Sequence, residues 1–340
     1  MEKTLKKIGF LPDLVNLKYP GYRKILDPIL QRSNRYSLLA TDDSVATFMD
    51  EIIPFGVLKS AEYAGKNLKT AYLIDSVSLG FKSVFLFYLK RGKIFHKELW
   101  LNLARFVKYA PLERRIVNGY QQVIVVSRHD AKYLRLRYKK NNIYTLENGV
   151  DFPIQSSEKN KCPQQNFTYT LGMLNYWGAG KPHDFIWFIE EILPNLRKEF
   201  PGIKILLAGR GCSLEVKEYF KKNNCEFVGE VENLSKFFSM IDIFFTTVRK
   251  ECGILNKVLD AFAHKKIVLG YEPNMKAFSS LTGGFFTYQN ANDMVKNITF
   301  IRDNPEKVRL MEKNAYEYVL KNHNWDTKVL ELDNILLEDI

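Results

Sequence analysis

Apolar and polar residues in the second half of the chain alternate between two patterns. Short apolar runs closed by Gly, Pro or Asn are typical of buried strands, and apolar residues three or four apart are typical of helices that cover a sheet. The expected strands are residues 168–173, 203–208, 226–228, 241–247 and 267–270. The expected helices are residues 185–200, 214–223, 234–240 and 256–264. This alternation predicts an α/β unit with a parallel sheet, whose ligands bind beyond the carboxyl ends of the strands.

The first half of the chain has a less regular pattern. We expect strands at residues 37–40, 70–74 and 122–126 and a helix at residues 129–137. Residues 82–97, KSVFLFYLKRGKIFHK, mix aromatic with basic side chains. This stretch has two interpretations, a core helix followed by a solvated turn or a segment that rests on a membrane surface.

The length of 340 residues exceeds what one hydrophobic core usually supports, so two domains are expected. The sequence ENGVD at residues 147–151 contains a turn signal, and the polar residues that follow it are typical of a linker. We therefore expect a first domain at residues 1–152 and a second domain at residues 153–320. Residues 321–340 are expected to form a helix that returns to the first domain.

The composition is that of a soluble globular protein, with 46% hydrophobic and 26% charged residues. The four cysteines lie far apart without a CxxC pair, which predicts neither a zinc knuckle nor a disulfide framework and suits a reducing cytoplasm. The five histidines show no metal-binding spacing, so we expect no metal site. The first residues make a poor signal peptide, and no apolar run is long enough to span a bilayer.

Basic residues are concentrated in the first half. Residues 1–150 carry 26 Lys and Arg against 13 Asp and Glu, whereas residues 151–340 carry 24 against 25. This bias favours an anionic partner such as a lipid surface, a lipid-linked acceptor or nucleic acid, and a solubility bias is the alternative. We expect no nucleic-acid partner, because this half carries no known nucleic-acid-binding module and its aromatic residues lie in apolar runs.

The sequence GILNKVLDAFA at residues 253–263 follows an expected strand and opens an expected helix. A glycine there lets a phosphate approach the backbone N–H groups at the positive end of the helix dipole. Asn256 and Lys257 fall in the first turn, and Asp260 lies on the same face as Lys257, where its carboxylate can accept hydrogen bonds from ribose hydroxyls. The alternative is an amphipathic helix with an Asn cap and an ion pair three residues apart.

This segment resembles the donor-site helix of GT-B glycosyltransferases of the large retaining family 4, the glycosyl transferases of group 1. Close members carry a G-I-x-N-K-x-x-E-A-M-A motif, so Gly253 and Ile254 also fall in the implied donor site. Asp260 stands where those members carry a Glu that binds the ribose. The general motif has a second Glu, which contacts the donor sugar, at the position of Cys252. Its neighbour Glu251 is therefore the candidate for that contact.

Further segments resemble the family in the expected order. They are VIVVSRHDA at 123–131, NGVD at 148–151, GMLNY at 172–176, GRG at 209–211, FVG at 227–229 and HNW at 323–325. The resemblance implies that Lys181 binds the diphosphate, that Gly209 and Arg210 belong to a glycine-rich turn of the donor site, and that the backbone at Val228 meets the base. It implies two Rossmann-like domains whose parallel sheets face a central cleft, with the acceptor bound by residues 1–152 and the nucleotide-sugar donor by residues 153–320.

Asp75 follows the expected strand at residues 70–74. It resembles an acidic or His position that related enzymes place near the donor sugar or the acceptor. The alternative is a cap for the helix that follows. Together with Lys257 and Glu251, Asp75 makes up the set of candidate catalytic residues.

The resemblance implies transfer of a sugar from a nucleotide-diphosphate sugar, with UDP favoured, to a glycan acceptor. The resemblance also implies retention of the anomeric configuration. We expect no metal ion to be needed, because Lys257, Lys181 and the helix N-terminus can offset charge on the leaving diphosphate. A lipid-linked acceptor for capsule, O-antigen (lipopolysaccharide) or exopolysaccharide assembly is expected, with the protein at the inner face of the plasma membrane. The alternatives are a non-catalytic GT-B partner protein and a GT-B sugar-nucleotide epimerase. The sequence does not indicate the oligomeric state.

Overall fold

The computed structural model describes residues 6–12, 20–39, 49–153, 169–178 and 183–337. These residues form two compact units. The first unit takes in residues 1–149, 250–254 and 323–340, and the second takes in residues 150–249 and 255–322. Within the described ranges, no helix combines the length and the apolar character needed to cross a bilayer.

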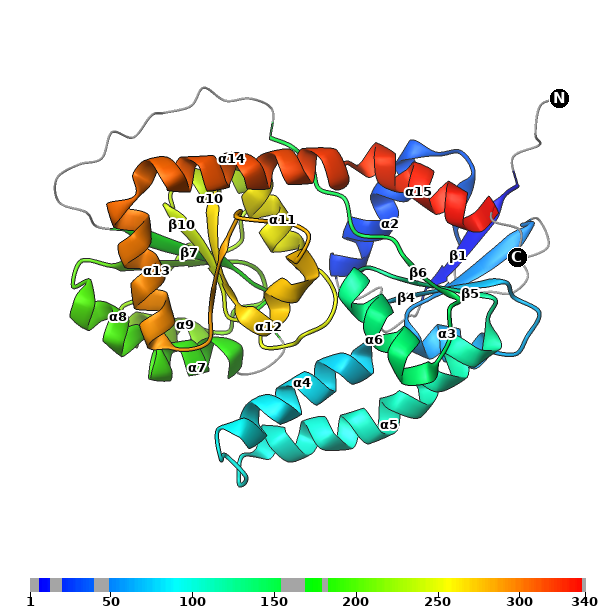
Figure 1. The fold of residues 1–340 in the computed structure, drawn as a ribbon, viewed down its shortest axis with the longest axis horizontal. Helices are drawn as coiled ribbons and strands as arrows, with labels where there is room; N and C mark the ends of the chain where they lie inside the picture. Colours follow the sequence, from blue (N-terminus) through cyan, green and yellow to red (C-terminus); the bar gives the residue numbers. More distant parts are fainter. Residues whose placement is uncertain (1–5, 13–19, 40–48, 154–168, 179–182, 338–340) are drawn as a thin grey trace. The chain divides into compact units, whose positions relative to one another are not determined.

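The first unit is built on a parallel six-stranded sheet in the order β2-β1-β3-β4-β5-β6. Its strands are β1 (Ile8–Pro12), β2 (Tyr36–Leu38), β3 (Glu51–Phe55), β4 (Thr70–Ile74), β5 (Gln122–Val125) and β6 (Ile143–Thr145). Its helices are α2 (Pro20–Arg32), α3 (Val57–Tyr63), α4 (Val77–Lys90), α5 (Lys97–Gly119), α6 (Arg128–Tyr138) and α15 (Trp325–Leu337). The helices flank both faces of the sheet, as expected for a Rossmann-like unit (Figure 1).

The second unit repeats this plan with the strand order β12-β11-β10-β7-β8-β9, again all parallel. Its strands are β7 (Thr170–Leu174), β8 (Lys204–Ala208), β9 (Glu226–Phe227), β10 (Ile243–Thr246), β11 (Ile267–Tyr271) and β12 (Phe286–Tyr288). The helices are α7 (His183–Glu191), α8 (Leu193–Glu199), α9 (Leu214–Lys222), α10 (Leu234–Ser239), α11 (Asn256–Ala263), α12 (Glu272–Met275), α13 (Ala291–Asp303) and α14 (Pro305–Asn322), and η2 (Lys276–Phe278) is a 3₁₀ turn.

The α/β prediction is confirmed, and the structure adds elements that the sequence pattern did not indicate. Strands β1 and β3 were not expected, because Pro12 and Pro54 lie within them and proline is rare inside sheets. The helix expected at residues 185–200 is divided at Ile192 into α7 and α8, because Pro194 at the start of α8 has no N–H to continue the helical hydrogen bonds. The strand expected at residues 70–74 has those bounds in the structure.

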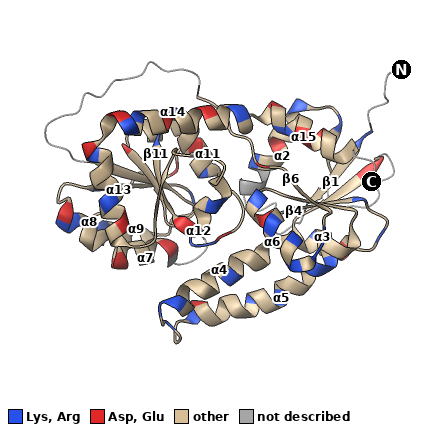
Figure 2. Ribbon diagram, in the orientation of Figure 1, with Lys and Arg blue, Asp and Glu red and all other residues tan. Residues whose placement is uncertain are grey.

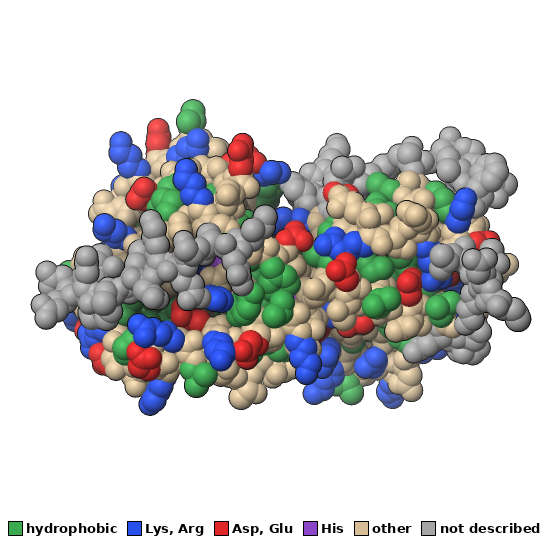
Figure 3. Space-filling view, turned by 90° about the horizontal axis from the view of Figure 1, so that it is seen from above, with side chains coloured by type: hydrophobic (Ala, Val, Ile, Leu, Met, Phe, Trp, Pro, Cys, Tyr) green, Lys and Arg blue, Asp and Glu red, His purple; other side chains and the backbone are tan. Residues whose placement is uncertain are grey.

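Charged side chains are distributed differently over different surfaces. On the face seen in Figure 3, acidic and basic side chains are interspersed. On the antiparallel pair of helices α4 and α5, Lys and Arg dominate and cluster at the turn between the two helices (Figure 2). Residues 82–108 carry seven Lys and Arg and one acidic residue, Glu98.

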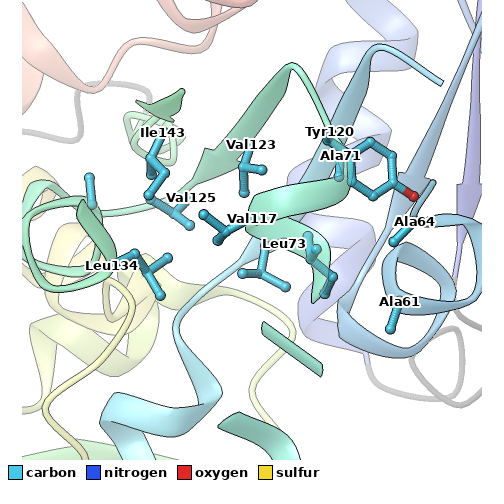
Figure 4. Packing of buried hydrophobic residues seen from close by; sticks show 12 residues of the cluster. Ala61, Ala64, Ala71, Leu73, Val117, Tyr120, Val123, Val125, Leu134 and Ile143 are labelled. Carbon is cyan, nitrogen blue, oxygen red and sulfur yellow. The ribbon is translucent and has the colours of Figure 1, made fainter. Parts of the chain in front are cut away.

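The core of the first unit lies between the sheet and the helices α3, α5 and α6 (Figure 4). Ala71 and Leu73 of β4 and Val123 and Val125 of β5 point into it and are shielded from water. These strands carry the segments that end in Asp75 and in Ser127, so packing of the core sets where both ends lie.

The C-terminal helix α15 belongs to the first unit, where it packs against α2. The amide of Gln122 donates to the carbonyl of Ile335 at 2.9 Å, and Arg35 pairs with Asp333 at 2.9 Å. Two segments that resemble the family meet at its start. The carbonyl of Asn148 lies 2.8 Å from Nδ1 of His323, and any side chain at Gly149 would overlap the ring of Trp325.

Candidate functional site

The carboxyl ends of β7, β8 and β9 in the second unit form a tightly packed backbone surface. Gly209 has a φ of +134°, and a Cβ there would lie 1.8 Å from the carbonyl oxygen of Asn175, so only glycine fits. The N–H of Gly209 donates to the carbonyl of Gly229 at 2.8 Å, and the N–H of Trp177 donates to the carbonyl of Arg210 at 2.8 Å. This is the edge at which parallel α/β sheets bind ligands.

Two cationic side chains of the second unit follow β10 and lie at this edge. Nζ of the half-buried Lys257, in the first turn of α11, donates to Oδ1 of Asn175 at 3.1 Å. Burial lowers the pKa of Lys257 to about 8, while the charge of Asp184 acts in the opposite direction. The guanidinium of Arg249 pairs with Asp184 at 2.5 Å and is only 3% exposed. A site that withdraws two cations from water is suited to an anionic ligand.

Helix α11 begins at this edge without a side-chain cap, because Leu255 occupies the N-cap position. The first N–H groups of a helix have no partner within the helix and carry the positive end of its dipole. Gly253, two residues before the cap, has a φ of +70°, which favours glycine. The eight-residue helix therefore presents the N-terminal geometry that binds phosphate groups in other proteins.

In the first unit, residues 250–254 lie against the ends of β4 and β5. Asp130 is fully buried and accepts three hydrogen bonds, from the N–H of Gly253 at 2.7 Å, the hydroxyl of Ser127 at 2.6 Å and the N–H of Ser76 at 3.3 Å. The thiol of Cys252 points at Oδ2 of Asp75, 3.7 Å away. The carboxyl of Asp130 thus holds the segment that precedes α11 onto the first unit.

Two buried carboxyl groups and a thiol form this cluster, and burial raises the pKa of each. Burial raises the pKa of Asp130 to about 7, and the nearby Asp75 adds to the effect. Burial also raises the pKa of Asp75, against which the charge of Lys250 acts. The pKa of the Cys252 thiol lies well above its usual value for the same reason, so Cys252 is a neutral thiol and not a thiolate. Such a cluster can hold a proton near neutral pH.

The backbone is strained next to Asp75. Ile74 has a φ of +76°, although a β-branched side chain strongly disfavours that region. The pairing between β4 and β5 shifts by one residue at the same place. The helix α4 that follows is capped by Ser76, whose hydroxyl accepts from the N–H of Leu79, so the expected cap role of Asp75 is wrong. Strain of this kind is found where a side chain is held for function.

Glu251 lies in the first unit, half-buried beside helix α6. Its carboxylate lies 3.1 Å from Nε2 of His129, and its N–H donates to the hydroxyl of Ser83 at 3.0 Å. Glu251, His129 and Ser83 all line a cavity of about 310 Å³ between helices α4 and α6. Within the described ranges, no group of His, Cys, Asp and Glu side chains is arranged to hold a metal ion.

Comparison with known proteins matches the second unit to a family and the chain to a fold. Residues 171–304 match the family described as "Glycosyl transferases group 1", which covers most of the second unit. No curated protein sequence matches the chain.

Solved structures match almost the whole chain. Sucrose-phosphate synthase from Thermosynechococcus elongatus has a TM-score of 0.73 at 13% identity, covering 97% of this chain and 98% of the other. HepE from Anabaena, determined with UDP, has a TM-score of 0.60 at 14% identity, covering 97% and 99%. TarM has a TM-score of 0.61 at 15% identity, covering 84% of this chain but 54% of TarM. The chain has the GT-B fold.

Within this GT-B fold, the sequence-predicted residues divide between the units. Lys257, Asn256 and Asp260 lie on α11, and Gly209, Arg210 and Val228 lie at the ends of β8 and β9 in the same unit. Asp75, Glu251, Gly253 and Ile254 belong to the first unit. Lys181 lies outside the described residues.

Three of the predicted donor-site residues have specific surroundings. Arg210 is largely exposed and pairs with Glu230. The N–H of Val228 donates to the carbonyl of Leu207 at 2.9 Å, so its backbone is engaged within the GT-B sheet. The backbone carbonyl of Asp260 accepts from Nδ1 of His264 at 2.7 Å.

Sequence reasoning missed Asp130, Arg249 and Asn175 as members of the two clusters. Asp130 could have been noticed in the sequence Ser127-Arg-His-Asp130, a capping-box spacing that places an acid in the first turn of α6. Arg249 follows a buried strand at a position where a GT-B sheet binds ligands. No local signal marks Asn175, because its contact with Lys257 joins residues 82 positions apart.

Proposed function

We propose that the chain is a glycosyltransferase that moves a sugar from a nucleotide-diphosphate sugar to a glycan acceptor. The observation that carries this proposal is a pair of cations at the strand ends of the second unit, the half-buried Lys257 on Asn175 and the buried Arg249 on Asp184. They lie beside the uncapped start of α11, within the segment that matches the group 1 family. UDP is the favoured nucleotide, because HepE, a structural neighbour, was determined with UDP.

The proposed mechanism depends on negative charge that develops on the leaving diphosphate during sugar transfer. As the bond between the anomeric carbon and the diphosphate breaks, negative charge accumulates on the leaving phosphate oxygens. Lys257 and the N-terminus of α11 stabilise that charge in a site shielded from water, where such stabilisation is strongest. The acceptor oxygen forms the new bond to the anomeric carbon on the face from which the diphosphate leaves, and the leaving phosphate takes the proton of that hydroxyl, so the sugar keeps its anomeric configuration. No step requires a metal ion.

The test is binding of UDP-, GDP- and TDP-sugars by thermal shift, followed by transfer assays with the donor that binds. Lys257→Ala should lower transfer at least a hundredfold while the fold is retained, because one charge-stabilising group contributes roughly 3–4 kcal/mol. Lys222→Ala, an exposed lysine on α9, is the control. Near-normal transfer by Lys257→Ala would exclude the proposed role.

Two other results would point to the alternatives. A purified chain that binds none of the sugar nucleotides would match a non-catalytic GT-B protein. Conversion of the donor into an isomer without transfer would match an epimerase. Retention is tested separately by the anomeric configuration of the product in NMR spectra.

We further propose that the acceptor is lipid-linked and that the protein works on the inner face of the plasma membrane. The support lies in the turn between α4 and α5, residues 89–100, which we call the hairpin tip. Phe95 is 95% exposed and Trp100 is 58% exposed, and Lys90, Lys93 and Lys97 surround them. Exposed aromatic side chains among cations are typical of surfaces that insert into an anionic lipid interface.

The hairpin tip is an ordered structure held by side-chain contacts. The rings of Tyr88 and His96 stack at 4.2 Å, and the indole N–H of Trp100 donates to the carbonyl of Ile94 at 2.9 Å. The guanidinium of Arg91 lies 3.8 Å from the centre of the Phe87 ring. A preformed tip loses little conformational entropy when it binds a surface, which favours this role. Capsule, O-antigen and exopolysaccharide assembly are pathways that use lipid-linked acceptors.

A further inference from the structure

Helices α4 and α6 of the first unit face each other across a cavity of about 310 Å³. Helix α4 contributes Leu79, Lys82, Ser83 and Leu86, which are spaced as one continuous helix face. From Leu79 to Leu86 the face rises through seven steps of the helix, so the cavity follows the helix for about 10 Å at 1.5 Å per residue.

Helix α6 lines the opposite side with the same spacing. Its residues are His129, Lys132, Tyr133 and Leu136. The two faces match position by position, with a lysine at the second place and a leucine at the last place of each. We call the cavity between them the α4–α6 groove.

The groove is polar at one end and apolar at the other. At the end formed by the first helical turns, the carboxylate of Glu251 contacts His129, and the N–H of Glu251 donates to Ser83 one turn further along α4. Two turns further along, Leu86 and Leu136 line the groove, and Leu136 is 71% exposed. A ligand that fits both ends has a polar head and an apolar chain.

The middle of the groove is positively charged. Lys82 and Lys132 are exposed, and Nζ of Lys82 lies 5.7 Å from the centre of the Tyr133 ring. Glu251 is the only acidic residue of the groove lining, and it is engaged by His129. The two lysines therefore attract an anionic group at the junction of the polar and apolar ends.

We propose that the α4–α6 groove is the acceptor subsite and that it binds a phosphate-bearing amphiphile. Lys82 and Lys132 take the phosphate or diphosphate group, and the hydrocarbon chain follows Leu86 and Leu136. Glu251 accepts a hydrogen bond from a hydroxyl of the acceptor head group. This inference rests on the proposed function, whose acceptor it specifies.

The experiment compares three probes by isothermal titration calorimetry. Farnesyl diphosphate carries both the anion and the chain, inorganic pyrophosphate carries the anion alone, and farnesol carries the chain alone. We expect farnesyl diphosphate to bind at least tenfold more tightly than either of the others. Pyrophosphate or farnesol binding as tightly as farnesyl diphosphate would overturn the amphiphile assignment, and so would the absence of farnesyl diphosphate binding.

Substitutions of groove residues then test whether farnesyl diphosphate binds in the α4–α6 groove. Lys82→Gln with Lys132→Gln should weaken farnesyl diphosphate at least tenfold and reduce the salt dependence of its binding. Leu86→Ser should weaken farnesyl diphosphate but not pyrophosphate. Lys140→Gln, which changes an exposed lysine just beyond α6, is the matched control and should leave binding unchanged. Unchanged farnesyl diphosphate binding in the double lysine variant would overturn the assignment.

Sugar-nucleotide binding separates this inference from the proposed function. The lysine variants of the groove should bind UDP-sugar like the unaltered protein, since the donor cluster belongs to the second unit. If the groove variants bind farnesyl diphosphate normally while Lys257→Ala abolishes transfer, the groove assignment fails and the transferase proposal stands. If no sugar nucleotide binds but the groove prefers farnesyl diphosphate, the transferase proposal fails.

Discussion

The carboxylate of Asp130 accepts a hydrogen bond of 2.7 Å from the N–H of Gly253, a residue 123 positions later in the chain. Asp130 also accepts from Ser127 at the start of α6 and from Ser76 at the end of β4. Residues 250–254, which lead directly into α11, are therefore anchored on the first unit by a side chain with a perturbed pKa. Protonation of Asp130 therefore changes a contact that holds residues 250–254, the segment that contains the candidate residues Glu251 and Gly253.

The first unit should become less stable as the pH rises, because the folded protein must give up the proton on Asp130. Burial raises the pKa of Asp130 from 3.8 to about 7, so between these values the folded protein binds a proton that the unfolded chain has lost. The free energy of unfolding then falls with increasing pH across this window and levels off above about pH 7. Asp130→Asn cannot ionise and should show a smaller fall between pH 4.5 and 7.5. The check is the free energy of unfolding from urea titrations at each pH. An equal fall with pH for the unaltered protein and for Asp130→Asn would contradict this prediction.

Donor affinity should fall as the pH rises through 8. Burial lowers the pKa of Lys257 to about 8, so its positive charge is present below that pH and is lost above it. Well above pH 8 we expect affinity for UDP to fall roughly tenfold per pH unit, if Lys257 is the dominant group. Lys257→Arg stays charged and should keep its affinity. The check is calorimetric titration with UDP from pH 6.5 to 9.5, and a flat profile for the unaltered protein would refute the assignment.

Gly209→Ala should disrupt the surface formed by the carboxyl ends of β7, β8 and β9, whereas Gly229→Ala should not. A Cβ at Gly209 would collide with the backbone of Asn175, which holds Lys257, so we expect a loss of stability of about 3 kcal/mol or more and weaker UDP binding. Gly229 also has a positive φ, +85°, but its Cβ would meet open space. Gly229→Ala should therefore lower the free energy of unfolding only by the backbone strain, about 1 kcal/mol. Equal effects of both substitutions on unfolding and UDP binding would argue against the steric explanation.

Phe95→Ser should weaken binding to anionic vesicles about tenfold, because an inserted Phe contributes roughly 1.5–3 kcal/mol. Lys93→Glu should weaken it further and remove part of the salt dependence. Leu214→Ser is the control, since Leu214 is an exposed apolar residue of the second unit, 78% accessible. Sedimentation with vesicles that contain phosphatidylglycerol measures the partition. A stronger effect of Leu214→Ser than of Phe95→Ser would rule out the hairpin tip as the contact.

The regular alternation of strands and helices made the α/β class predictable from the sequence. Buried parallel strands such as β8 and β10 are continuous apolar runs, and amphipathic helices follow them at short intervals. The pattern was weakest where proline interrupts a strand, as in β1 and β3. There, pairing with neighbouring strands outweighs the local preference of the residues, and no local rule reports that pairing.

The amino-acid sequence alone determined the two α/β halves, the bias of basic residues towards the first half and the glycine and lysine positions that begin α11. These features depend on residues close together in the chain, whose preferences are local. Only the tertiary structure decided that Glu251 pairs with His129, that Cys252 points at Asp75 and that Asn175 holds Lys257. Those contacts join residues from 82 to 177 positions apart. Asn175 meets Lys257 because they follow β7 and β10, neighbouring strands whose carboxyl ends lie at one edge of the second sheet. Glu251 and Cys252 meet residues of the first unit because residues 250–254 pack there.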